Sequence, residues 1–134
     1  MLKHDNRMPY VAKILAVDDE PELTELMRFH LVRAGHDVVT AANGWEAIAS
    51  VKHRRPDIIL LDLMLPDLDG FGVCEILRGD PLTATIPIII ISAWASTDSQ
   101  NLGLELGALD YITKPFSPQD LVQRVNRLMQ ARAV

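Results

Sequence analysis

The sequence predicts an α/β fold, a doubly wound five-stranded parallel sheet with helices on both faces. Short apolar runs alternate along the chain with longer segments whose apolar residues recur every three or four positions. Some of these runs, such as 58–61 and 88–91, are apolar on both faces, and such strands need helices above and below the sheet. Strands that alternate with helices pair in parallel through right-handed crossovers.

The first half of the chain supplies three of the strands and two of the helices. Residues 13–17 form an apolar run that acidic residues close, and Pro21 then suits the first turn of a helix that Gly35 ends. A β-branched run indicates a second strand within 36–42. The next helix is expected over 45–54, where Pro56 follows, and the third strand over 57–62.

The second half repeats this alternation after a loop that is rich in turn-forming residues. Gly107 ends one of its helices, and the pair Ser117-Pro118 begins the last one. The expected elements are a loop over 63–70, helices over 71–78, 97–106 and 118–132, and strands over 86–91 and 110–113.

Length, charge and cysteine content limit the class of protein. The chain has 134 residues, which suits a single domain; we expect that domain over 13–132, after an N-terminal extension over 1–12. With 13 basic and 18 acidic residues the net charge is -5, which argues against direct nucleic acid binding. The single cysteine, Cys74, excludes a disulfide within the chain and favours a reducing compartment.

The apolar runs are also far shorter than the roughly 20 residues that span a bilayer. The first residues are polar and lack the apolar core of a signal peptide. We therefore expect a cytoplasmic protein that does not interact with membranes.

Cys74 lies among apolar helix residues, which indicates an inert, packed thiol.

Polar side chains follow four of the predicted strands at the point where each strand ends. Asp18 and Asp19 follow the first strand, Asp62 ends the third, Ser92 follows the fourth and Lys114 follows the fifth. Each of them alone has an ordinary explanation, as a helix cap, a turn residue or a surface lysine. Because the carboxyl ends of parallel strands meet in one crevice, their joint occurrence indicates a functional site.

The chemistry of this set indicates phosphoryl transfer. Three carboxylates at close range repel one another and raise their pKa values unless a cation offsets the repulsion. Mg²⁺ prefers such oxygen ligands together with phosphate oxygens, and Lys114 adds a second positive charge. A carboxylate held there can attack phosphorus, while the hydroxyl of Ser92 donates to an oxygen of the transferred group.

The same residues resemble the signature of bacterial response-regulator receiver domains. The resemblance runs from about residue 13 to residue 129 and implies a flavodoxin-like (βα)5 fold with strand order 2-1-3-4-5. It is carried by Asp18-Asp19, Leu61-Asp62-Leu63-Met64-Leu65-Pro66, Asp69-Gly70, Ser92-Ala93 and Tyr111-Ile112-Thr113-Lys114-Pro115-Phe116.

The resemblance implies a role for each matching residue. Asp62 would be the phospho-acceptor, and Ser92 and Lys114 would bind the phosphoryl oxygens. Direct Mg²⁺ ligands would be Asp19, Asp62 and the backbone carbonyl of Met64, with Asp18 acting through water. Tyr111 would be the aromatic switch that turns inward when Ser92 moves, and Lys114-Pro115 would be a cis peptide.

The partner implied by the resemblance is a histidine kinase or a phosphotransfer protein that carries phosphohistidine. The module would catalyse only its own phosphorylation and dephosphorylation, so it is not expected to be an enzyme.

The chain most resembles receivers of the winged-helix transcription-factor subfamily, which dimerise through the fourth helix, fifth strand and fifth helix. The charge pattern of that dimer is matched by Glu105, Asp110, Asp120 and Arg124, whereas Gln100 and Leu109 depart from it. Leu104 and Leu109 offer an apolar output patch instead, and a monomer is the third possibility. The sequence leaves open whether the domain stands alone or precedes an output domain.

Two other functions are alternatives to the signalling module. A small phosphotransferase or phosphatase with an aspartyl nucleophile, of the haloacid-dehalogenase type, needs a second acid two residues after the nucleophile, where this chain has Met64. A flavodoxin-like carrier of FMN needs a turn rich in Ser, Thr and Gly after the first strand, where the acidic residues 18–20 would repel a phosphate.

Bulky Met64 and Trp94 border the predicted acceptor, and Trp94 is expected to shield it or to contact the donor.

Overall fold

The computed structural model describes residues 11–133, which form five strands and five helices in strict alternation. Residues 1–10 of the predicted N-terminal extension lie outside the described residues. The elements are β1 (Lys13–Val17), α1 (Pro21–Arg33), β2 (Asp37–Ala41), α2 (Gly44–His53), β3 (Ile58–Leu61), α3 (Gly70–Arg78), β4 (Ile88–Ser92), α4 (Thr97–Glu105), β5 (Asp110–Thr113) and α5 (Pro118–Ala133).

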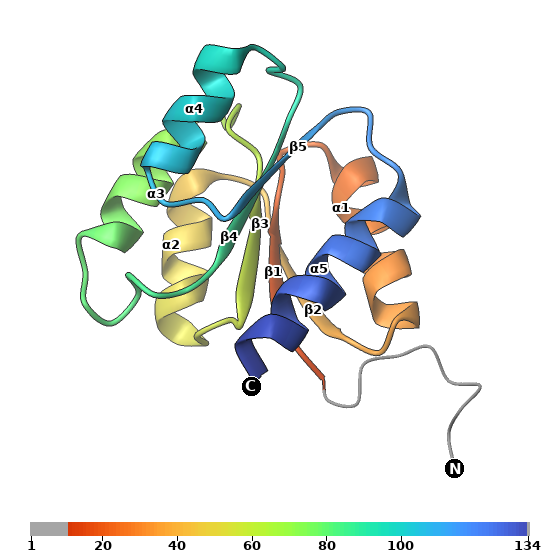
Figure 1. The fold of residues 1–134 in the computed structure, drawn as a ribbon. Helices are drawn as coiled ribbons and strands as arrows, with labels where there is room; N and C mark the ends of the chain where they lie inside the picture. Colours follow the sequence, from red (N-terminus) through yellow and green to blue (C-terminus); the bar gives the residue numbers. More distant parts are fainter. Residues whose placement is uncertain (1–10, 134) are drawn as a thin grey trace.

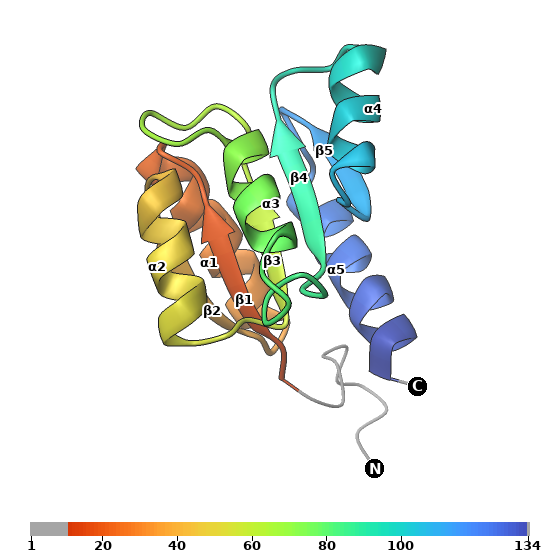
Figure 2. The ribbon, with the colours of Figure 1, turned by 90° about the vertical axis from the view of Figure 1, so that its left-hand side faces the viewer.

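The five strands form one parallel sheet in the order β2-β1-β3-β4-β5, which confirms the predicted fold and strand order. Helices α2, α3 and α4 cover one face of the sheet, and α1 and α5 cover the other (Figure 1). Figure 2 looks onto the face that carries α2, α3 and α4, and the arrows of β1 and β4 point to the same end of the sheet. That end collects the carboxyl termini of all five strands.

Two separate apolar cores lie on the two faces because side chains alternate along each strand. Leu15 and Val17 of β1 point into the core under α2 and α3. Ile14 and Ala16 point into the core under α1 and α5. The same alternation continues in β3 and β4, so both faces of the central strands are apolar. This explains the continuous apolar runs of the sequence.

Short polar side chains begin most of the helices. The side chain of Asn43 accepts a hydrogen bond from the Glu46 N–H at the start of α2, and Asp69 accepts one from the Gly72 N–H at the start of α3. Ser96 caps α4 in the same way, through the Ser99 N–H. These caps satisfy N–H groups that the first helical turn leaves without a partner.

The strands over 13–17 and 110–113 have the predicted boundaries. Other boundaries differ by one or two residues, and β4 shows the reason most clearly. The strand was expected from residue 86 but begins at Ile88. The N–H of Ile86 is already bonded to the carbonyl of Thr83 in a turn, and Pro87 has no N–H to give to a neighbouring strand.

No helix among residues 11–133 is long and apolar enough to cross a bilayer.

His36 joins the start of the sheet to α5 through two hydrogen bonds from one buried ring. Its Nδ1 accepts a hydrogen bond from the backbone N–H of Ala12, at 3.2 Å. Its Nε2 lies 2.7 Å from Oδ1 of Asn126 on α5. With Nδ1 occupied as an acceptor, Nε2 carries the ring proton and donates a hydrogen bond to Oδ1 of Asn126. The ring therefore supplies an acceptor that the buried Ala12 N–H needs.

We expect the substitution His36→Leu to lower the free energy of unfolding by about 1–3 kcal/mol, because it leaves the Ala12 N–H buried without an acceptor. Urea denaturation followed by far-UV circular dichroism measures this change. The matched control is His53→Leu at the exposed end of α2, which should change stability by less than about 0.5 kcal/mol. Equal losses in the two variants would show that the His36 hydrogen bonds contribute nothing.

Candidate functional site

The predicted site residues lie at the carboxyl end of the sheet. Asp18 follows β1, Asp62 follows β3, Ser92 is the last residue of β4 and Lys114 follows β5. The parallel register places Val17 beside Leu61 and Ser92 beside Thr113, so the residues at the strand ends meet at one level. The sheet therefore brings together side chains that are up to 96 positions apart in the sequence.

Asp62 is buried at the end of the central strand, with only 3% of its surface exposed. Its Oδ2 accepts a hydrogen bond from the Lys114 ammonium at 3.0 Å. Its Oδ1 accepts one from the backbone N–H of Met64 at 3.2 Å. These two contacts hold both oxygens of the carboxylate in fixed directions.

Lys114 bridges the acidic residues. Its Nζ lies 2.7 Å from Oδ2 of Asp18, 3.0 Å from Oδ2 of Asp62 and 3.4 Å from Oε1 of Glu20. Asp18 and Asp62 are both buried, so their bonds to the ammonium are partly shielded from water. The Lys114-Pro115 peptide is cis, as predicted.

The surroundings change the pKa values of this pair. Burial raises the pKa of the Asp62 carboxyl above its ordinary value. The hydrogen bonds from Met64 and Lys114 oppose this rise, and charge repulsion from Asp18 makes the smallest contribution to it. The direction agrees with the sequence-based expectation, but the main cause is burial rather than charge repulsion. Burial alone would lower the pKa of Lys114, yet its hydrogen bonds to Asp18 and Asp62 outweigh this and raise it.

Three consecutive acidic residues could hold a divalent cation beside Asp62. Oxygens of Asp18, Asp19 and Glu20 all lie within 4.8 Å of one another, a spacing and donor type that suit a hard cation such as Mg²⁺. Asp19 and Glu20 are exposed, whereas Asp18 is buried. Glu20 was not predicted as part of this site, although its position directly after two aspartates was the available signal.

Ser92 and Tyr111 meet at the backbone of Trp94. The Ser92 Oγ accepts a hydrogen bond from the Trp94 N–H at 3.1 Å. The phenol of Tyr111 donates to the Trp94 carbonyl at 2.6 Å. Helix α4 lies close over Tyr111, since a Cβ on Gly103 would stand 3.3 Å from the tyrosine ring. Sequence reasoning named Ser92 and Tyr111 but did not predict that Trp94 joins them.

Gly70 allows α3 to begin directly against the segment that follows β3 and contains Asp62. A Cβ at this position would lie 2.5 Å from the Asp62 carbonyl oxygen and 2.7 Å from Cα of Leu63. The Gly70 N–H also donates to the Leu63 carbonyl at 2.9 Å. A side chain here would force the helix away from the segment that positions Asp62.

Met64 and Trp94 form the exposed apolar border of the site, as predicted. Met64 is 47% exposed and Trp94 is 41% exposed, although both lie two residues after a buried site residue. Cys74 of α3 lies deeper, on the side of the helix that packs into the core, where burial raises the pKa of its thiol to about 12. Such a thiol is unreactive, which agrees with the expected inert role.

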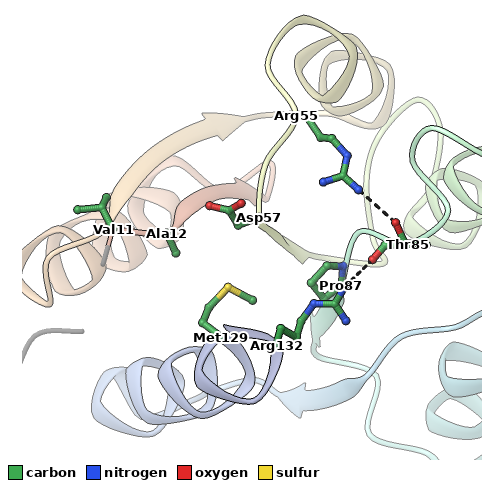
Figure 3. Close-up of a pocket in the computed structure, with 8 residues that line it drawn as sticks. All are labelled: Val11, Ala12, Arg55, Asp57, Thr85, Pro87, Met129 and Arg132. Atoms are coloured by element: carbon green, nitrogen blue, oxygen red, sulfur yellow. Dashed lines mark hydrogen bonds between the residues drawn. The ribbon is translucent and has the colours of Figure 1, made fainter. Parts of the chain in front are cut away.

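A cavity of about 410 Å³ lies at the opposite end of the sheet from Asp62. It is formed around the amino ends of β1, β3 and β4, and Figure 3 shows Arg55 and Arg132 both directed towards Thr85. The two arginines hold the loop before β4 in this way. None of the acidic residues that contact Lys114 lines this cavity, so it is separate from the candidate site.

Comparison with known proteins agrees with this geometry. The profile of the response regulator receiver domain matches residues 14–126. The alkaline phosphatase synthesis transcriptional regulatory protein PhoP of Bacillus subtilis is 46% identical over 118 residues, which cover 88% of this chain and 48% of PhoP. The DNA-binding response regulator MtrA of Mycolicibacterium smegmatis is 44% identical over 113 residues, which cover 84% of this chain and 48% of MtrA. This chain thus spans about half the length of these relatives.

Solved structures show the same fold over nearly the whole length of their chains. The receiver domain of the Francisella response regulator 1452 superposes with a TM-score of 0.85 and 36% identity, covering 90% of this chain and 98% of that one. The chemotaxis response regulator CheY4 of Vibrio cholerae gives a TM-score of 0.83 and 32% identity, covering 88% of this chain and 98% of that one. With a family profile over most of its length, this chain belongs to the response regulator receiver domain family.

Proposed function

We propose that this chain is a phosphorylation-controlled module of a two-component system and that it accepts a phosphoryl group on Asp62. The observation that carries the proposal is the buried Asp62 carboxylate, fixed by Lys114 on one oxygen and by the Met64 N–H on the other. A purely structural ion pair would give the buried aspartate a cation of its own. Here the ammonium is shared with Asp18 and Glu20 at the end of the sheet where ligands bind.

The donor in this proposal is a phosphohistidine of a histidine kinase or of a phosphotransfer protein. An Asp62 oxygen attacks phosphorus and forms an O–P bond, the P–N bond to the donor breaks, and the imidazole nitrogen keeps the electron pair and takes up a proton. Lys114 neutralises charge on the transferred group, and the Ser92 hydroxyl donates to one of its oxygens. Because the carboxylate that becomes phosphorylated belongs to the protein itself, the protein acts as a substrate of the kinase rather than as an enzyme on other molecules.

The acidic cluster fits a bound Mg²⁺, and receiver domains generally bind this ion in an acidic pocket. We assign Asp19, Asp62 and the Met64 carbonyl as direct ligands and Asp18 as a ligand through water, with Glu20 beside them. The bound ion would neutralise charge on the phosphoryl group. The close oxygens of Asp18, Asp19 and Glu20 support the part of this assignment that concerns Asp18 and Asp19.

Phosphorylation would act on an output through α4, β5 and α5. In this proposal Ser92 moves towards the phosphoryl group and Tyr111 follows as the aromatic switch. Exposed leucines give this face an apolar surface for a second copy of the chain. These leucines are Leu102, Leu104 and Leu109. Arg124 binds Asp110 and Asp120 of its own chain, so a charged pairing between copies would have to break these contacts.

The relatives suggest the wider role of this domain. PhoP is a transcriptional regulatory protein and MtrA is a DNA-binding response regulator, and both are about twice as long as the matched region. We infer that this domain regulates such an output in the cytoplasm and does not itself bind nucleic acid, in line with its net charge of -5.

We expect the protein to gain one phosphoryl group when it is incubated with Mg²⁺ and acetyl phosphate, and Asp62→Asn to gain none, since the amide cannot attack phosphorus. Intact-mass spectrometry measures the gain. The matched control is Asp57→Asn, at the other end of β3, which should be labelled like the parent. Stoichiometric labelling of the Asp62→Asn protein would contradict the assignment.

We expect Asp19→Asn to stabilise the metal-free protein, because it removes one of three crowded carboxylates. Added Mg²⁺ should stabilise the parent by mass action and the variant much less. Urea titrations in EDTA and in excess Mg²⁺ measure both effects, with Glu75→Gln on the exposed side of α3 as the control for loss of a charge. A variant that is less stable than the parent in EDTA, or that gains as much from Mg²⁺, would refute a shared metal site.

We expect phosphorylation to promote dimers. The substitution Leu109→Glu should prevent them, because the glutamate places a charge in the apolar contact between copies. Sedimentation velocity with and without acetyl phosphate measures the dimer. Leu82→Glu is the control, since Leu82 is the more exposed leucine and lies in the loop between α3 and β4. A parent that stays monomeric when fully phosphorylated would rule out this role for the α4–β5–α5 face.

A further inference from the structure

We propose that Trp94 is a positioning residue that ties Ser92 and Tyr111 to Phe71 on α3, so that its stack on Phe71 changes when Asp62 is phosphorylated. The inference rests on the proposed function of Asp62. It assigns a role to a side chain that the phosphoryl-transfer chemistry does not use.

Three separate contacts converge on Trp94, which lies between β4 and α4. Its N–H donates to the Ser92 Oγ and its carbonyl accepts from the Tyr111 phenol. Its indole stacks on the Phe71 ring, with centroids 6.1 Å apart and planes inclined by 27°. One residue therefore contacts both predicted switch residues through its backbone and the first turn of α3 through its side chain.

In the proposed function the Ser92 hydroxyl moves towards the phosphoryl group. In this structure the Ser92 Oγ is engaged with the Trp94 N–H, whereas Asp62 is held by Lys114 and Met64. A shift of Ser92 towards a phosphoryl group on Asp62 either breaks the bond to Trp94 or carries the Trp94 backbone along. We expect the Trp94 backbone to move with Ser92, and this movement disturbs the bond from Tyr111 to the Trp94 carbonyl and changes how the indole lies on Phe71.

We expect the stack to resist this movement, because displacing the indole would cost its ring contact with Phe71. Aromatic pairs shift such equilibria by about two- to tenfold. The anchor is on α3, whose first residue Gly70 packs directly against the Asp62 backbone. The loop that carries Trp94 is thus held to the same segment that positions the acceptor.

The test uses the emission of Trp94 in a Trp45→Phe background, which leaves one tryptophan in the chain. Acetyl phosphate with Mg²⁺ is added while intact mass, emission and acrylamide quenching are followed. We expect emission and quenching to change in proportion to the mass gain, and not to change in the Asp62→Asn protein. Full labelling without any change at Trp94 would overturn this inference alone. Absence of labelling would overturn the proposed function and this inference with it.

Variants of Phe71 separate positioning from general packing. Phe71→Leu removes the stack, so we expect stronger acrylamide quenching of Trp94 before phosphorylation and an initial labelling rate about two- to tenfold higher. Phe71→Tyr keeps an aromatic ring and should restore both parental values. A Leu variant with parental quenching, or with an unchanged or lower labelling rate, would show that the stack does not hold Ser92.

Discussion

The bridge from the Lys114 ammonium to Asp18 and Asp62 is the constraint on which the site depends. Both carboxylates are buried, and without the cation they would face each other with their charge uncompensated. Burial raises the folded pKa of Asp62, so its ionisation opposes folding: this penalty is absent below the unfolded pKa and complete above the folded pKa. The pKa of Lys114 is raised, so its stabilising contribution is present at neutral pH and is lost as pH rises through its folded pKa.

The sheet makes this bridge possible because both faces of its central strands are occupied by core. Leu15 and Val17 belong to one core, and Ile14 and Ala16 to the other. A strand fixed on both sides cannot slip by one residue without exchanging its two cores. The strand ends, and with them the acids and the lysine, are therefore held at one level. A rigid sheet thus presents reactive groups that local sequence alone could not bring together.

Much of this could be predicted from the sequence. Apolar runs and Gly or Pro boundaries indicated all ten elements, and polar residues at strand ends indicated Asp18, Asp62, Ser92 and Lys114. Other features depend on contacts between distant segments, which periodicity does not encode. The burial of His36 between Ala12 and Asn126 depends on how α5 packs. The stack of Trp94 on Phe71 depends on the path of the loop after β4.

The buried thiol of Cys74 has a consequence for experiments on this domain. Because the pKa of the Cys74 thiol is about 12, almost none of this thiol is thiolate near neutral pH. The apolar core under α2 and α3 also covers it. Maleimide reagents therefore find no competing nucleophilic sulfur on the folded molecule. A cysteine introduced on the surface can carry a single dye or spin label in the otherwise natural chain.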